Sequence, residues 1–132
     1  MSDYTIARID EVPDPSGDYP GEIRMFTGPL GTEQMAFTYR RMPPQTGGMK
    51  GLRWGHSHRT QEEIYFVLSG TLRVKVGDEE FDLGPREALR LSPDCVRAVW
   101  NDGETDVELI MCSPRVEDLR AEAEIHQDFW QD

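Results

Sequence analysis

Between residues 52 and 112 the sequence is a succession of short stretches in which apolar and polar residues alternate, separated by turns that contain Gly, Pro, Asn or Asp. The stretch TLRVKV at 71–76 is the clearest, because its three apolar residues fall on one face of an extended strand. Gly77 and Asp78 follow as a hairpin turn, and 80–83 is the expected returning strand. Many short strands joined by such turns predict an antiparallel β-sandwich or barrel.

The other elements extend this all-β pattern over a single domain, residues 1–132. The first thirty residues are rich in Pro and Gly, and they predict an irregular arm with one short strand at Tyr4–Ile9. The barrel core is expected at about 34–113. Its strands are expected at 34–41, 52–58, 63–69, 71–76, 80–83, 88–92, 96–100 and 107–112.

One helix is expected after the last strand. Pro114 suits a first helical turn, Ser113 is a candidate N-cap, and apolar residues recur at helical spacing over about 115–130. This apolar stripe predicts that the helix packs on the outside of the barrel. His126 lies on the stripe, so we expect a packed helix residue there rather than a metal ligand.

The composition argues against several classes of partner. With 132 residues, of which 37% are hydrophobic and 30% charged, the chain has the balance of a soluble globular domain. A net charge of −11 repels both nucleic-acid phosphates and anionic membranes. No apolar run approaches the length of a bilayer span, and the first residues lack the basic-then-apolar pattern of a secretion signal. We therefore expect a cytoplasmic protein whose partner is a small molecule.

The segment GHSHRTQEEIYFVLSG, residues 55–70, contains two of the three histidines of the chain. Strand alternation places His56 and His58 on the same face. Glu63 begins the next strand and is better placed than Glu62 to join them from a neighbouring strand. Two imidazoles and one carboxylate suit Fe, Mn, Ni, Co or Zn. The competing interpretation is a polar turn whose histidines are solvated.

The spacing of this segment resembles the first signature of the cupin superfamily: His-x-His, four residues, Glu, six residues, Gly, here ending at Gly70. A second signature of that family is similar to the segment from Gly84 to Asn101. The resemblance covers about 52–101, and 107–112 continues it as a later barrel strand. It implies a small jelly-roll β-barrel, so we expect a cupin-like all-β fold with an N-terminal arm and a C-terminal helix.

The chain departs from the family pattern at the last metal-binding position, where Arg97 replaces the usual histidine. A guanidinium has no available lone pair and cannot bind a cation. Four orientations of Arg97 stay open. It can point inward and oppose a metal, pair with Glu63, bind an anionic ligand, or turn outward and leave the three-residue site intact.

Aromatic residues are expected to line the barrel interior beside these groups. Trp54 shares the face of His56 and His58, and Tyr65 shares the face of Glu63, so both are candidate ligand-binding residues together with Arg97. The apolar residues on the opposite face of 63–69 predict a covered sheet, which is consistent with a homodimer.

Two principal functions follow from these residues and the resemblance. The first is a small-molecule cupin with an incomplete divalent-metal site formed by His56, His58 and Glu63, for which the resemblance implies dioxygenase, isomerase or lyase chemistry. The second is a non-catalytic, metal-free cupin that binds or senses a small ligand and pairs Glu63 with Arg97. A structural or regulatory partner of another protein is a weaker third alternative.

Overall fold

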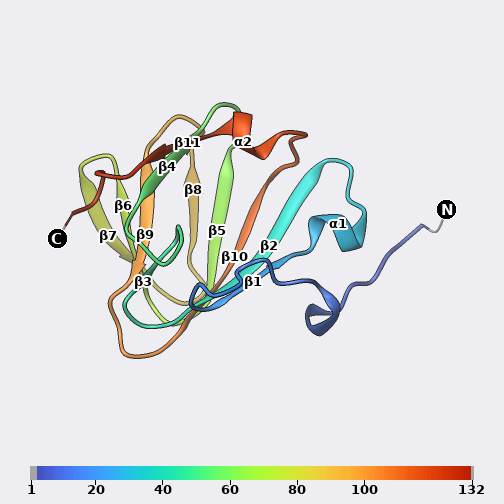
Figure 1. Cartoon of the computed structure of the whole chain (residues 1–132), viewed down its shortest axis with the longest axis horizontal. Coiled ribbons are helices and arrows are strands. Elements are labelled where there is room, and N and C mark those ends of the chain that lie inside the picture. The colour runs from blue at the N-terminus through green and yellow to red at the C-terminus, as the bar shows by residue number, and fades with distance from the viewer. Residues whose placement is uncertain (1–2, 132) are drawn as a thin grey trace.

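Two antiparallel sheets face each other and enclose the core of the protein in the computed structural model, which describes residues 3–131 (Figure 1). The first sheet contains, in spatial order, β1 (Glu22–Met25), β2 (Met35–Met42), β10 (Val107–Pro114), β5 (Glu63–Ser69) and β8 (Ala88–Leu91). The second contains β11 (Ala123–His126), β4 (Gly55–His58), β9 (Arg97–Asn101), β6 (Leu72–Val76) and β7 (Glu79–Leu83), with β3 (Thr46–Gly47) beside β9. The predicted all-β jelly-roll class is confirmed.

Strand β5 shows why these residues form a sheet with one buried face. Alternate residues from Glu63 are buried, whereas Ile64, Phe66 and Leu68 are 45%, 37% and 44% exposed on the outer face. The inward residues of both sheets form one core. Its buried members are Met42, Tyr65, Val67, Leu72, Val74, Leu83, Leu91, Val99, Val107 and Leu109. The outer face of β5 is open in the single chain, and the expected homodimer stays a prediction.

Two residues of the motif segments fix turns. Gly70 ends β5 with a φ of +78°, and a Cβ there would lie 2.5 Å from the carbonyl oxygen of Asp106, so this turn requires glycine. Asn101 is buried and its amide donates to the carbonyls of Met42 and Thr105. Asn101, the last residue of the segment that resembles the second cupin signature, therefore links the end of β9 to the end of β2 and to the turn that follows β9.

The N-terminal arm differs in part from the prediction. Residues 4–8 form no strand, and Ile9–Glu11 is a 3-10 helix. Tyr4 and Ile6 are 74% and 67% exposed, because no neighbouring strand lies beside them, and the arm extends away from the barrel (Figure 1). The arm region contributes β1, which pairs with β2, and the short helix α1 (Thr27–Leu30) instead.

The C-terminal helix is present but much shorter than predicted. Helix α2 covers only Leu119–Glu122 and is capped by Asp118, whose carboxylate accepts from the backbone of Arg120 and Ala121. The chain then becomes β11, which pairs with β4. The unpaired backbone groups at the edge of β4 are satisfied by this strand, which outweighs the helical pattern. His126 is accordingly a strand residue rather than a helix residue, with Nε2 3.3 Å from Ser57 Oγ.

The strand predicted at 52–58 also begins later than expected. Leu52 forms only an isolated bridge with Met49, and β4 starts at Gly55. A Cβ at position 55 would lie 2.6 Å from the Phe129 ring, so the start of β4 is covered closely by the C-terminal segment. Gly48, Met49 and Trp54, in the segment before β4, line the cavity inside the barrel.

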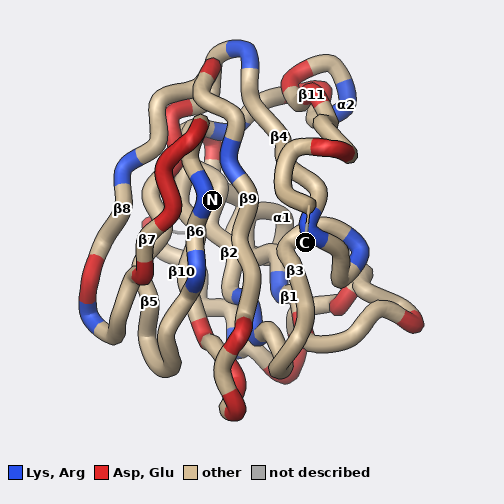
Figure 2. The backbone as a smooth tube through the Cα atoms, turned by 90° about the vertical axis from the view of Figure 1, so that its left-hand side faces the viewer, with Lys and Arg blue, Asp and Glu red and all other residues tan. Residues whose placement is uncertain are grey.

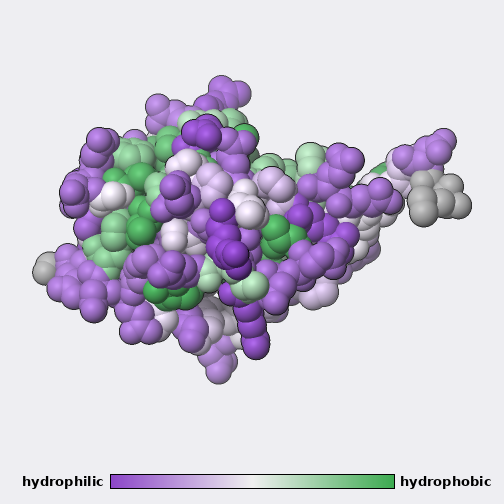
Figure 3. All heavy atoms as spheres, turned by 90° about the horizontal axis from the view of Figure 1, so that it is seen from above, coloured by the Kyte–Doolittle hydropathy of each residue, from purple (hydrophilic) through white to green (hydrophobic). Residues whose placement is uncertain are grey.

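Apart from Glu63 and Glu122, which are buried, the described acidic residues are at least partly exposed. Strand β7 is marked by acidic residues in Figure 2, and its neighbour β6 carries Arg73, which forms ion pairs with Glu80 and Asp82 at 3.6 and 3.2 Å. Figure 3 shows hydrophilic residues over much of the face seen from above, with separate apolar areas between them. Within residues 3–131, no helix has the length and apolar character that crossing a membrane requires.

Candidate metal centre

A cluster of two imidazoles and one carboxylate lies between the two sheets, where β4 and β5 follow each other in the chain. His56 and His58 come from β4 of the second sheet, and Glu63 is the first residue of β5 in the first sheet. Residues 59–62 connect β4 to β5 and so lead the chain from the second sheet to the first. The turn of this link is fixed by the Glu122 carboxylate, which accepts hydrogen bonds from the backbone of Thr60 and Gln61.

The three side chains converge on a common point. Glu63 Oε1 lies 3.2 Å from His58 Nε2 and 3.7 Å from His56 Nε2. The two imidazole rings stand edge to face, with centroids 5.0 Å apart, and one ligating atom from each residue lies within 4.8 Å of the others. Ligands placed about 2.0–2.2 Å from a shared ion lie about 3–3.5 Å from one another, so this spacing is close to that of a metal site.

The hydrogen bonding of the histidines provides a second test of this fit. Nδ1 of both His56 and His58 is buried and lacks a hydrogen-bond partner among the described residues, and His58 Nε2 makes no hydrogen bond although it lies 3.2 Å from Glu63 Oε1. Buried polar atoms without partners cost free energy, and they commonly mark a position for an ion or water. The donor set of two nitrogens and one carboxylate oxygen fits a divalent transition metal.

The protonation states also suit metal binding. Burial lowers the pKa of His56, and the nearby Arg97 and His58 lower it further, against the opposing effect of Glu63. Burial raises the pKa of Glu63, but the neighbouring imidazoles lower it by more, so the net pKa lies far below its usual range. A neutral imidazole and an ionised carboxylate are the forms that bind a cation.

Arg97 is opposite His56 in the pairing of β9 with β4 and is fully buried. Its guanidinium donates to the carbonyls of Ser92 and Pro93 at 3.0 and 3.2 Å. Its Nη2 lies 3.8 Å from Glu63 Oε1, which is an ion pair longer than a hydrogen bond. The outward orientation is therefore wrong, and Arg97 is an interior cation held mainly by backbone carbonyls.

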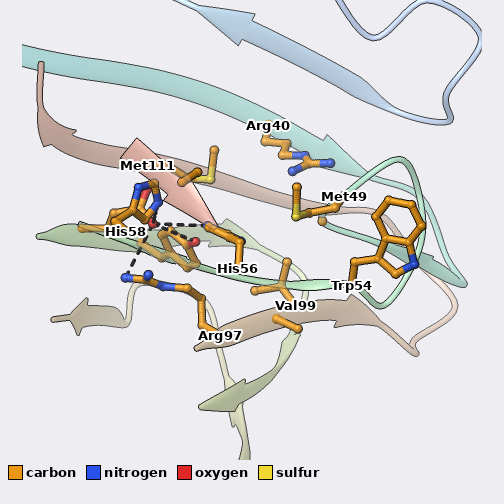
Figure 4. A pocket seen from close by; sticks show the side chains of 13 residues that line it. Arg40, Met49, Trp54, His56, His58, Arg97, Val99 and Met111 are labelled. Carbon is orange, nitrogen blue, oxygen red and sulfur yellow. Dashed lines mark hydrogen bonds and ion pairs between the residues drawn. The ribbon is translucent and has the colours of Figure 1, made fainter. Parts of the chain in front are cut away.

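The cluster forms part of the wall of a cavity of about 240 Å³. Trp54, Tyr65 and Arg97, the three predicted ligand-binding residues, all line it. Tyr65 is buried and its hydroxyl donates to Glu63 Oε1 at 3.3 Å. Figure 4 shows His58 and Arg97 toward one end of this cavity and Trp54 at the other, with Arg40 across from Val99.

A second cavity, of about 290 Å³, meets the cluster from another side. It shares His58, Glu63 and Met111 with the first cavity and continues toward Thr38 and Leu119. His58 and Glu63 thus lie between two cavities, whereas His56 lines only the first.

Sequence reasoning missed Arg40 as a residue of the site. Large apolar residues of β2, Met35, Phe37 and Tyr39, alternate with smaller or polar ones, but it is Arg40, from the other set, that lines the cavity. Of the three, Tyr39 is buried and Met35 is 65% exposed. Phe37 packs on Phe26 outside the barrel, with ring centroids 5.8 Å apart. Met42 could have indicated this, because residues two positions apart on a strand point to the same face. Met42 is a buried core residue, so Arg40 on the same strand also points inward.

Comparison with known proteins identifies the family. The model of the Cupin_2 family, described as a cupin domain, matches residues 40–113, which is more than half of the chain. The chain therefore belongs to this family of cupin domains. An uncharacterized protein of Methanocaldococcus jannaschii is 28% identical over 58 residues, which are 44% of this chain and 46% of that protein. The match thus spans about half of that relative.

Solved structures agree on the fold. A cupin protein from Bacteroides fragilis has a TM-score of 0.71 and 19% identity, with 90% of each chain covered. A protein from Silicibacter pomeroyi, described as a sugar phosphate isomerase from a cupin superfamily, has a TM-score of 0.71 and 13% identity, covering 93% of this chain and 92% of that one. At these identities the likeness concerns the fold alone.

Proposed function

We propose that this protein is a metal-dependent cupin enzyme that acts on a small polar molecule in its barrel. The observation that carries the proposal is the convergence of His56, His58 and Glu63 within 4.8 Å on a cavity, with buried imidazole nitrogens that no described residue satisfies. A cavity of about 240 Å³ is smaller than the ~300–1,000 Å³ typical of drug-sized ligands, which favours a small substrate.

Each residue of the site has a defined role in this proposal. His56, His58 and Glu63 would hold the ion, which supplies Lewis-acid polarisation of a substrate oxygen when bound. Tyr65 stays a neutral hydroxyl, because burial raises its pKa and Glu63 raises it further. Its hydrogen bond to Glu63 Oε1 orients the carboxylate. Trp54 forms an apolar wall at the other end of the cavity.

An isomerase is the reaction type that we favour among the three implied by the resemblance. It requires no second reactant, whereas a dioxygenase must also admit O₂ to a cavity of about 240 Å³. A lyase likewise needs only one substrate, so the choice between isomerase and lyase rests on the comparison that follows. The Silicibacter pomeroyi protein of the same fold, described as a sugar phosphate isomerase, supports this choice.

The competing function is a metal-free cupin that binds a small ligand without catalysis. The observation that favours it is the ion pair between Arg97 Nη2 and Glu63 Oε1 at 3.8 Å, which supplies Glu63 with a positive partner. The contact is too long for the short charge-assisted hydrogen bond that would replace a metal as the main partner of this carboxylate.

Metal analysis of protein purified without a histidine tag separates the two functions. We expect one transition-metal ion per chain in the wild type, and a higher melting temperature on adding Fe, Mn, Ni, Co or Zn to metal-depleted protein. His58→Ala should lower the metal affinity by about 100-fold or more, because a direct ligand is lost. His126→Ala is the matched control, since His126 lies on β11 and does not line the cavity.

Absence of metal in the purified wild type, together with no thermal shift for any of the five ions, would refute the metal-dependent function. An equal loss of affinity in His126→Ala would show that the metal binds elsewhere.

A further inference from the structure

Arg40 is a cation inside the barrel that has no hydrogen-bond or ion-pair partner within residues 3–131. It lies on β2, next to Leu109 in the pairing of β2 with β10, and lines the cavity together with His56 and Trp54. Its guanidinium donates no hydrogen bond and forms no ion pair with the described residues. Burying a charge without a partner costs free energy, so structural stability does not explain an arginine at this position.

The neighbouring residue shows what an ordinary arginine does on this strand. Arg41 points to the outside, where its guanidinium lies 3.5 Å from Glu22 and 3.4 Å from Asp106. Arg97, the other cation of the cavity, is bound to the carbonyls of Ser92 and Pro93. Arg40 alone among these three keeps its donors free for a molecule in the cavity.

The charges of the cavity favour an anion. Arg40 and Arg97 are its cations, and Glu63 is the one carboxylate among the described residues that line it, so two positive charges face one negative charge. The whole chain has a net charge of −11, which repels anions from the outer surface. An anion would thus bind this protein only where cations are gathered locally.

The shape of the site leaves the guanidinium accessible. Arg40 Nη1 lies 3.8 Å from the position that a Cβ would take on Gly48, so the guanidinium approaches the cavity wall at a residue without a side chain. Figure 4 shows Arg40 beside Met49 and across the cavity from Val99. A planar guanidinium in this setting can donate two parallel hydrogen bonds to a carboxylate or phosphate.

We propose that Arg40 binds an anionic group, a carboxylate or a phosphate, of the small molecule whose other polar atoms face His56, His58 and Glu63. The substrate is therefore a small organic anion, and Arg40 sets its orientation by holding the end remote from the reacting atoms. The inference rests on the proposed function, because that function places the ligand in this cavity.

Anion binding to metal-depleted protein tests Arg40 separately from the metal. Inorganic phosphate and malonate are titrated at constant ionic strength, and binding is followed by the NMR signal of the Trp54 indole N–H. We expect one of the two anions to bind the wild type with a dissociation constant in the millimolar range, and the stronger one identifies the anionic group. Arg40→Gln should weaken this binding by about tenfold or more.

Two further variants complete the test. Arg41→Gln removes the same charge from the adjacent, outward position and should change the affinity by less than about twofold. Arg40→Lys keeps the charge but not the paired donors, and should give an intermediate affinity. It also provides a folded variant if Arg40→Gln is unstable.

The proposal is overturned if neither anion shifts the Trp54 signal of the wild type, if Arg40→Gln and Arg40→Lys both bind like the wild type, or if Arg41→Gln loses as much affinity as Arg40→Gln. Metal binding that survives in Arg40→Gln leaves the proposed function intact whichever result is obtained. Conversely, if His58→Ala loses the metal but still binds the anion, anion binding by Arg40 does not depend on the metal site.

Discussion

The cavity contains two arginines that the fold uses in opposite ways. Arg97, beside the candidate metal centre, is fully buried and tied to two backbone carbonyls and to Glu63. Arg40, on the facing sheet, is half-buried and has no described protein partner. The difference indicates that one positive charge belongs to the structure of the barrel, whereas the other is available to a ligand.

The largest expected difference between the two arginines is in the free energy of unfolding after each guanidinium is removed. We expect Arg97→Leu to lower the free energy of unfolding by about 3 kcal/mol, because it leaves the carbonyls of Ser92 and Pro93 unsatisfied and Glu63 without its cation. Arg40→Leu should change it by less than about 1 kcal/mol. Urea unfolding of the metal-depleted variants measures both. Equal losses would contradict the distinction between the two arginines.

A histidine at position 97 should complete the metal site. Arg97→His removes a positive charge and places an imidazole opposite His56, where β9 pairs with β4. We expect metal affinity to rise by about 10- to 100-fold, from reduced repulsion and an added ligand. Competition with a chelator of known affinity measures the change, and Arg97→Gln distinguishes loss of charge from gain of a ligand. Unchanged or weaker binding in Arg97→His would show that Arg97 does not occupy the fourth ligand position.

The 59–62 link, whose turn is held by Glu122, should make the stability of the protein depend on pH in the acid range. Burial raises the pKa of Glu122, but hydrogen bonds from Thr60 and Gln61 lower it by more, so the folded protein binds this proton only at lower pH than the unfolded chain. The stabilisation is therefore present above about pH 4.5 and is lost as the pH falls below it. We expect Glu122→Gln to reduce the acid destabilisation by about 1 kcal/mol.

Thermal unfolding of metal-depleted protein between neutral and acid pH checks this prediction. Glu124→Gln, at an exposed position on β11, is the control and should retain the wild-type slope. A slope equally reduced in both variants would mean that general surface charge, rather than the 59–62 link, controls the acid response.

Much of the fold could be predicted because local pattern and tertiary packing agree. The alternation of 71–76 and the turn at Gly77 correctly indicated β6 and its hairpin with β7. The pattern of 63–69 likewise placed Glu63 and Tyr65 on the buried face. The C-terminal helix was overestimated because the apolar spacing of 115–130 does not reveal that β4 has an open edge, which residues 123–126 fill.

The sequence by itself determined the strand alternation, the turns, and the shared face of His56 and His58, because these depend on neighbours within a few residues. Tertiary structure decided which cations meet in the cavity. Arg97 turned inward because the carbonyls of Ser92 and Pro93 satisfy it there. Phe37 packs on Phe26 on the outer face of β2. Because strand residues alternate between the two faces, Arg40 therefore points to the inner face and lines the cavity. Such partners lie far apart in the chain, and no local pattern specifies them.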